Sequence, residues 1–225
     1  MEDKHPFLRK TPWDANAFGI DTYEIIAYTE ESLQAIAGMP GHFTIKVDPL
    51  ADKRLLHEYG FYYCDTLIEP YATREQFIFY DKEGVSLAKD VPLAELLAMV
   101  DGAFVYGRFH RDFAIDDSRA DLRYANWLRQ LYEQGNVWAL MYNEELAGFF
   151  GYEHNKILLH ALHDAYRGKG MAKYFWSQAI RRMFAEGHHE LTSSISAANL
   201  AVLNLYASLG FRFRHAVDVY QKLQR

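Results

Sequence analysis

A run of glycines and cations stands directly in front of an apolar helical pattern. The run Arg167–Gly170 contains two glycines and two cations, and apolar residues recur from Ala172 at steps of three and four, which is typical of a helix on a sheet. The first turn of a helix presents backbone N–H groups that have no intrahelical partner, and glycines let an anion approach them closely. The run therefore predicts a binding site for phosphate or pyrophosphate.

The spacing of this run excludes two better-known phosphate loops. The Walker pattern needs a glycine five residues before Gly168, where His163 stands. The dinucleotide pattern needs a glycine or alanine three residues after Gly170, where Lys173 stands. A strand-to-helix turn that contains glycine only for conformational reasons stays open as the alternative.

Strands and further helices must position this run, and they are predicted from hydrophobic periodicity and turn residues. The expected strands cover residues 104–109, 137–142, 146–154, 156–162, 191–196 and 211–223, and the expected helices cover 118–133, 172–184 and 199–209. Three consecutive strands between 137 and 162 predict an antiparallel meander. The sequence therefore predicts an α/β fold in which a meander precedes alternating strands and helices.

The chain is expected to contain two parts. Residues 88–102 contain a turn, a short helix begun at Pro92 and a closing glycine, which predicts a smaller N-terminal α/β domain at 1–102 and a second domain at 103–225. The order strand, helix, Gly-Phe and strand occurs at 45–68 and again from residue 191 onward. This echo suggests a related half-fold in the N-terminal domain, with a chance match as the alternative.

Charge and composition exclude several classes of protein. The formal net charge of −6 disfavours a non-specific nucleic-acid binder, which needs a broad basic face. Residues 1–105 carry a net charge of −9 and residues 106–225 a net charge of +3, so an anionic ligand fits the second part better. No segment has the form of a secretion signal or the apolar length of a membrane span, so we expect a cytoplasmic protein with no membrane partner.

Cysteine and histidine usage argues against a metal site. The single cysteine, Cys64, excludes a disulfide framework and a cysteine-rich zinc site. His160 and His163 have no third ligand at a fitting spacing, so no metal is expected.

Two motifs together resemble one superfamily. The run Arg167–Ala172 resembles the coenzyme A pyrophosphate loop of the Gcn5-related N-acetyltransferase (GNAT) superfamily, whose pattern is Arg or Gln, two residues, Gly, one residue, then Gly or Ala. The later segment with Asn199, Tyr206 and Gly210-Phe211 resembles that superfamily's asparagine, tyrosine and Gly-Phe helix. The resemblance covers about residues 137 to 215. It implies the GNAT fold, with a mixed and mostly antiparallel central sheet flanked by helices, and the cofactor acetyl-CoA.

The resemblance also implies a set of cofactor-binding residues. These are Arg167, Gly168, Lys169, Gly170, Met171 and Ala172 at the pyrophosphate, His160, Ala161 and Leu162 along the pantetheine arm, and Asn199 and Tyr206 on the later helix. Asn199 has a plain helix N-cap as its alternative. Tyr206 is the expected general acid, with a core aromatic as its alternative.

The general base is the least determined of the expected catalytic groups. Glu153, His154, His160 and His163 all fall near the relevant strands, and histidine titrates near neutral pH. We select His160 as the candidate base, with a relay through water as the alternative.

A closer resemblance suggests the acceptor. The Asn16–Gly19 element, the stretch Gly107–His110 and the helix that contains Trp127 are similar to the TDP-fucosamine acetyltransferase family, which acetylates the amine of a nucleotide-linked deoxysugar. The expected acceptor-binding residues are Trp13, Asn16, Phe18, Arg108 and Arg111. Aromatic faces suit sugar and base rings and arginines suit a diphosphate, whereas a core position is the alternative for Trp13 and Phe18.

The expected activity is therefore transfer of an acetyl group from acetyl-CoA to a primary amine of a small molecule, with a nucleotide-linked amino deoxysugar as the acceptor. The acidic N-terminal half favours a rival acceptor that is cationic, such as a polyamine, an antibiotic or a peptide N-terminus. A non-catalytic coenzyme A sensor is a second rival. We expect no nucleic-acid partner, and we leave a homodimer open.

Overall fold

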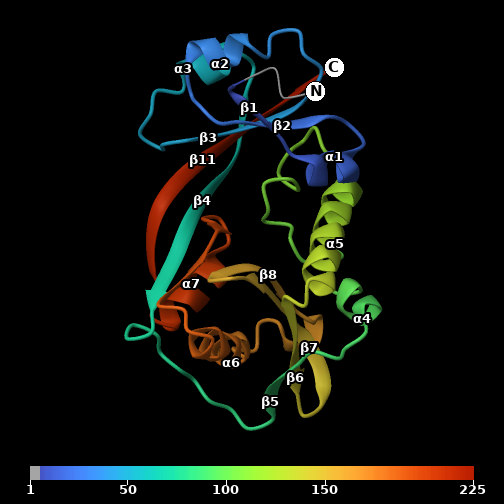
Figure 1. The fold of residues 1–225 in the computed structure, drawn as a ribbon, viewed down its shortest axis with the longest axis vertical. Helices are drawn as coiled ribbons and strands as arrows, with labels where there is room; N and C mark the ends of the chain where they lie inside the picture. Colours follow the sequence, from blue (N-terminus) through green and yellow to red (C-terminus); the bar gives the residue numbers. More distant parts are fainter. Residues whose placement is uncertain (1–5) are drawn as a thin grey trace. The chain divides into compact units, whose positions relative to one another are not determined.

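The computed structural model describes residues 6–225. The chain forms two compact units (Figure 1). Unit 1 contains Met1–Leu67, Val105–Arg123 and Ala216–Arg225, and unit 2 contains Ile68–Phe104 and Tyr124–His215. These units do not follow the expected consecutive domains. Whether segments 1–102 and 103–225 fold independently stays a prediction.

Unit 1 is a small mixed sheet with short helices. Its elements are β1 (Leu8–Lys10), α1 (Pro12–Phe18), β2 (Thr22–Ile25), α2 (Glu30–Gln34), β3 (Gly41–Val47), α3 (Arg54–Glu58), the first part of β4 (Tyr62–Thr73), the start of α5 (Asp117–Glu133) and the end of β11 (Arg212–Gln224). β2 pairs with β3 in parallel, whereas β3 pairs with β11 antiparallel. Phe43 and Ile45 of β3 pack with Leu33 of α2 and Leu56 of α3 in one core.

The expected strand at 104–109 is wrong, because these residues form turns instead. Phe109 is buried against Phe18, with 5.0 Å between the ring centroids, whereas Tyr106 is 52% exposed. The next turn is fixed by Asp112, whose buried carboxylate is bonded to His42 Nε2 at 2.7 Å and accepts the Tyr62 hydroxyl at 2.8 Å. Single inward side chains, and not strand pairing, therefore account for the apolar pattern of this segment.

Unit 2 contains the larger part of the strands. Its further elements are β5 (Val85–Ala88), α4 (Leu93–Leu97), β6 (Val137–Tyr142), β7 (Glu145–Glu153), β8 (Lys156–Leu162), a 3₁₀ helix (Asp164–Tyr166), α6 (Ala172–Ala185), β9 (Glu190–Ser193), β10 (Ile195–Ser196) and α7 (Leu200–Ser208). The strand order is β4-β9-β8-β7-β6-β5, and β10 pairs with β4. The expected meander is confirmed, because β6, β7 and β8 are antiparallel neighbours. β8 and β9 are parallel, which makes the sheet mixed.

Helices cover both faces of this sheet (Figure 1). Trp138 of β6 packs in a core with α6 and α7, and its neighbour Val137 packs in a core with α4 and α5. Adjacent strand residues point to opposite faces, so a strand buried on both sides has a nearly continuous apolar sequence. The expected α/β architecture is therefore confirmed.

Three expected helices are present with small changes. α6 and α7 have almost the predicted bounds, and α5 begins at Asp117. Ser118 is thus inside α5, and Asp121, which has capping-box spacing from it, instead lies 3.0 Å from His110 Nε2. The expected strand at 191–196 is divided into β9 and β10.

The echo between the two halves includes the same helix ending. Gly60 after α3 and Gly210 after α7 have φ angles of 77° and 85°. Phe61 N–H donates to the Leu56 carbonyl at 2.8 Å, and Phe211 N–H donates to the Tyr206 carbonyl at 3.0 Å. Both bonds follow the Schellman pattern of helix termination. Leu56 thus occupies in one copy the place that Tyr206 has in the other, and a common origin of the copies stays a prediction.

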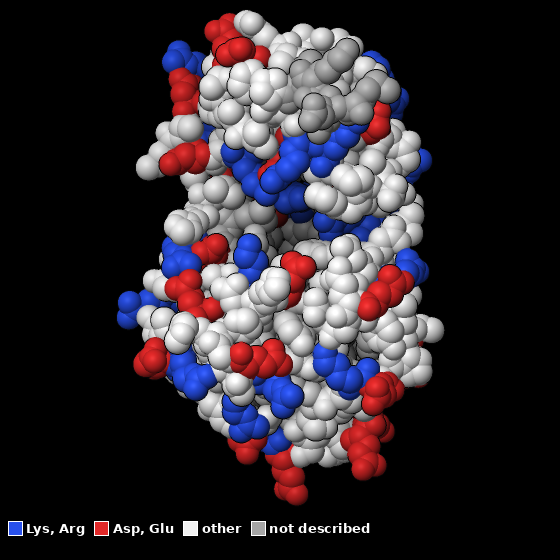
Figure 2. Space-filling view, viewed as in Figure 1, with Lys and Arg blue, Asp and Glu red and all other residues white. Residues whose placement is uncertain are grey.

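Charged side chains of both signs cover the face drawn in Figure 2, and Lys and Arg gather in one area of it. Within residues 6–225, no helix has the length and apolarity that crossing a membrane requires.

Candidate functional site

The strands β8 and β9 separate soon after they begin. Their parallel pairing covers Lys156 with Thr192 and Ile157 with Ser193, whereas β8 continues to Leu162. At the fork, the Ser193 hydroxyl donates to the Ile157 carbonyl at 2.9 Å. On its other edge β8 stays paired with β7 as far as Leu162. Among the described residues, β8 has no strand partner on its β9-facing edge beyond Ile157, and the Arg167 side chain donates to the Leu162 carbonyl at the end of the strand.

The expected pantetheine residues lie on this separated part of β8. His160 is partly exposed as a whole residue although its imidazole is buried, and Ala161 and Leu162 are each 8% exposed. The His160 ring is stacked with Phe150 and has its edge toward Trp176, at centroid distances of 6.1 and 4.8 Å. Sequence reasoning missed Phe150, Trp176 and Ser193 as neighbours of this site, because their apolar or small side chains resemble ordinary core residues.

The glycine-rich run forms the exposed turn that leads into α6. Gly168 and Gly170 both have a φ of 69°, which glycine adopts without a steric penalty. No atom lies within 4 Å of where a Cβ would stand at either glycine. In the described part of the chain, the N–H groups of residues 168–173 make no hydrogen bond to other protein groups. The turn thus presents consecutive free amides at a helix N-terminus, which fits a pyrophosphate.

The Arg167 side chain already binds groups of the protein itself. Its Nε donates to the Leu162 carbonyl at 2.7 Å, and its NH1 lies 2.6 Å from Asp164 Oδ1. These contacts tie the turn to the end of β8. Lys169 is exposed on the same turn. The expected contribution of both cations to anion binding stays a prediction.

Tyr206 and His160 are brought together although 46 residues separate them. Tyr206 is wholly buried, and its hydroxyl lies 3.2 Å from His160 Nε2. Burial raises the pKa of the Tyr206 phenol well above its usual value. Burial also lowers the pKa of His160 to about 4, so its imidazole is neutral at pH 7. The arrangement is a neutral imidazole hydrogen-bonded to a phenol that keeps its proton.

The burial of His160 makes it a weak candidate for the expected general base. A histidine with a pKa near 4 removes protons weakly at neutral pH. The other candidates are dispersed: Glu153 and His154 lie at the β7–β8 turn, and His163 Nδ1 accepts the Ala165 N–H at 3.2 Å. The structure therefore assembles a group that orients the Tyr206 hydroxyl more clearly than it assembles a strong base. The basic role of His160 stays a prediction.

Asn199 has the position of a helix cap. Its Oδ1 accepts the Val202 N–H at 3.2 Å, and α7 starts at the next residue. The N-cap alternative for Asn199 is thus confirmed, and contact with a coenzyme stays a prediction.

The expected acceptor-binding residues all belong to unit 1, whereas the residues described above belong to unit 2. Trp13 is 49% exposed and Asn16 is exposed, but Phe18 is fully buried, as its core alternative required. The Arg108 guanidinium lies over the Phe109 ring at 4.7 Å, and Arg111 NH1 pairs with buried Asp65 at 2.7 Å. Their role toward an acceptor stays a prediction.

A family comparison matches the part of the chain that carries both motifs. Residues 103–211 match the model of the Acetyltransferase (GNAT) family. A search of curated proteins found no match. The family match supports the superfamily assignment that the two motifs indicated.

Several solved structures are similar to this chain. A functionally unknown conserved protein from Staphylococcus epidermidis has a TM-score of 0.65 at 14% identity, over 100% of this chain and 93% of its own. A GCN5-related N-acetyltransferase from Sphaerobacter thermophilus has a TM-score of 0.57 at 13% identity, over 90% of this chain and 72% of its own.

A third neighbour is the GCN5-related glucosamine N-acetyltransferase region of a fungal multi-domain GH3 β-N-acetylglucosaminidase. Its TM-score is 0.60 at 11% identity, over 90% of this chain and 30% of its own. At such identities the likeness concerns the fold alone. The chain has the GNAT fold, as its sequence indicated.

Proposed function

We propose that this protein is an acetyl-CoA-dependent N-acetyltransferase that acts on a primary amine of a small molecule. The premise is that residues 103–211 match the GNAT acetyltransferase family. The observation that carries the proposal is the row of free amides at residues 168–173, on a turn that Arg167 ties to the end of β8, whose edge is not paired with β9 beyond Ile157. A diphosphate joined to an extended chain of amides is the kind of ligand that these two features fit together.

The chain's own groups divide the binding between them. The N–H groups of residues 168–173 hold the diphosphate, and the helix dipole of α6 favours its negative charge. The backbone of 158–162 pairs with the amides of the pantetheine arm, and one of its N–H groups supplies the oxyanion donor. Acetyl-CoA, when bound, supplies the acetyl group as a thioester.

Tyr206 is the proposed general acid, and His160 positions it. The raised pKa of Tyr206 keeps the phenol protonated at the pH values where an amine acceptor is neutral. His160 Nε2 at 3.2 Å restricts rotation of the hydroxyl, and burial keeps that imidazole uncharged. In this account the acceptor amine loses its proton to water rather than to a protein base.

For the acceptor we propose a nucleotide-linked amino deoxysugar. The support is chemical: exposed Trp13 can stack on a ring, and partly exposed Arg111 can pair with a diphosphate. The net charge of −9 over residues 1–105 favours a cationic amine as a second candidate.

A turnover screen tests these proposals. Purified protein and acetyl-CoA are incubated separately with a nucleotide-linked amino sugar, the free amino sugar, a polyamine and a peptide with a free N-terminus, and thiol release is recorded. We expect release with the nucleotide-linked amino sugar in excess of the free sugar. Greater release with the polyamine or peptide would replace the acceptor assignment. Binding of acetyl-CoA without release in any arm would favour the sensor and contradict the enzyme.

A further inference from the structure

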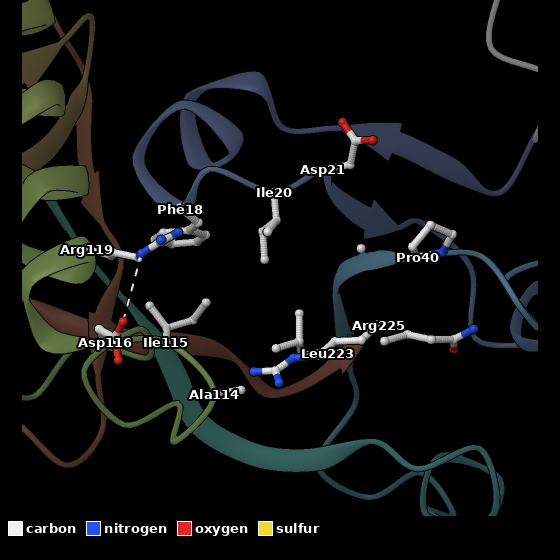
Figure 3. Close-up of a pocket in the computed structure, with 12 residues that line it drawn as sticks. Phe18, Ile20, Asp21, Pro40, Ala114, Ile115, Asp116, Arg119, Leu223 and Arg225 are labelled. Carbon is white, nitrogen blue, oxygen red and sulfur yellow. Dashed lines mark ion pairs between the residues drawn. The ribbon is translucent and has the colours of Figure 1, made fainter.

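Unit 1 contains a cavity that the proposed activity does not use. The cavity has a volume of about 400 Å³ and lies where the end of α1, the start of β3, the segment 114–119 and the end of β11 meet (Figure 3). This volume falls in the range typical of small-molecule sites. Its principal lining residues are Phe18, Ile20, Ile115, Leu223, Arg119 and Arg225.

The apolar side of the cavity is formed by a packed core. Phe18 and Ile115 belong to one buried cluster with Phe109, and Ile20 packs against it. In Figure 3 the Ile20 and Leu223 side chains point into the space from opposite sides. Because the cluster is packed without a ligand, the apolar surface is already formed and binding requires little ordering.

Gly19 allows Arg119, which lines the cavity, to lie close to the end of α1. This residue follows α1 with a φ of 69°, and a Cβ there would lie 3.2 Å from Arg119 NH1. The absence of a side chain therefore lets the guanidinium lie against the turn. The Asn16–Gly19 element of the sequence thus contributes Phe18 to the cavity wall, and its Gly19 leaves room for Arg119.

The charged side chains that line the cavity differ in the direction in which they point. In Figure 3 the guanidinium groups of Arg119 and Arg225 point toward the space, whereas the Asp21 carboxylate points away from it. Asp116 Oδ2 lies 3.9 Å from Arg119 Nε, and both side chains are exposed, at 85% and 47%. An exposed pair at this separation binds weakly, so Arg119 stays available to another anion.

We propose that this cavity binds a small carboxylate that has an apolar body, such as an aromatic or short aliphatic acid. The carboxylate pairs with Arg119 in the bidentate geometry that guanidinium favours. The apolar body lies over Ile20, Ile115 and Leu223. Every lining residue belongs to unit 1, whereas the residues of the proposed cofactor site belong to unit 2.

Titration calorimetry with three matched probes tests this proposal. Phenylacetate, phenylethanol and phenylethylamine share an aromatic body and differ in charge. We expect phenylacetate to bind at least about tenfold more tightly than the other two, because only a carboxylate pairs with the guanidinium. Equal binding of all three probes, or no binding of phenylacetate at millimolar concentration, would overturn the proposal.

Variants locate the binding. Arg119→Gln should weaken phenylacetate binding at least about tenfold, and Arg119→Lys should weaken it less because a cation remains. Arg129→Gln on the same helix is the control, since Arg129 is exposed and its NH1 donates to Asn126 Oδ1. Circular dichroism and acetyl-CoA uptake should be unchanged in all three. Unchanged phenylacetate affinity in a folded Arg119→Gln protein would refute the site, whatever the fate of the acetyltransferase proposal.

Discussion

At the scale of single residues, the account depends on the contact between Tyr206 and His160. The sequence indicates Tyr206 as the general acid and His160 as the candidate base, and the structure places His160 Nε2 3.2 Å from the Tyr206 hydroxyl. The imidazole packs against Phe150 and Trp176, and its burial lowers its pKa to about 4. The sequence could not reveal this change in pKa, because it arises from packing between distant elements.

Tyr206→Phe tests the general acid. The variant keeps the buried ring and removes only the hydroxyl, so kcat should fall at least about tenfold while the affinity for acetyl-CoA changes little. Steady-state kinetics and calorimetry measure the two effects. Tyr132→Phe is the control, because the Tyr132 hydroxyl donates to the Val91 carbonyl and should not affect kcat. An unchanged kcat in Tyr206→Phe would show that Tyr206 is not the general acid.

His160 should make the folded protein sensitive to acid. The unfolded histidine has a pKa of 6.5 and the folded one a pKa of about 4, so the unfolded state binds a proton first as the pH falls. This contribution to stability is complete above pH 6.5 and is lost between pH 6.5 and 4.

His160→Gln should therefore lose less unfolding free energy between pH 7 and pH 5 than the parent protein. Urea denaturation at both pH values measures the difference. His189→Gln, which changes an exposed histidine, should behave as the parent does. Equal losses in His160→Gln and the parent would show that His160 is not held neutral by folding.

At the scale of elements, the local patterns predicted most of unit 2. The strands β6, β7 and β8 and the helices α6 and α7 were predictable because their periodicity and turn residues are local. The strand expected at 104–109 failed because Phe109 is buried by Phe18 of α1, which is distant in sequence. The separation of β8 from β9 was likewise invisible, since no residue type marks where parallel pairing stops.

The end of α7 provides a stability prediction. Gly210 has a φ of 85°, and a Cβ there would lie 2.0 Å from the Gln76 carbonyl oxygen. Gly187 after α6 has a φ of 99° but open space around it. Gly187→Ala should cost about 1–2 kcal/mol for the left-handed backbone alone. Gly210→Ala should cost clearly more, because the clash is with backbone. Urea denaturation compares them, and equal costs would contradict the close approach.

At the scale of the whole molecule, the two units each combine segments that are distant in sequence. Unit 1 takes residues from the start, the middle and the end of the chain. Pro92 and Gly102 mark local breaks in the chain. Such local breaks cannot reveal that the later segment Val105–Arg123 belongs to the same unit as the N-terminal strands. Buried Asp112, held by His42 and Tyr62, is the kind of long-range contact that decides this assignment.

The division of roles between the units follows from the same arrangement. The fork of β8 and β9, the free amides and Tyr206 all lie in unit 2, which contains most of the residues matched by the family model. The resemblance was able to indicate this site because its two motifs stand in one continuous stretch. The acceptor side had no such motif, so its residues were chosen by type and remain proposals.

The most direct test of the account is calorimetric titration of acetyl-CoA into the parent protein, Gly170→Val and Gly187→Val. Both variants place a β-branched residue at a left-handed position beside α6, but only Gly170 belongs to the turn that carries the free amides. The account predicts that the parent and Gly187→Val bind acetyl-CoA alike and that Gly170→Val binds at least about tenfold more weakly. Absence of binding by the parent, or equal binding by both variants, would contradict it.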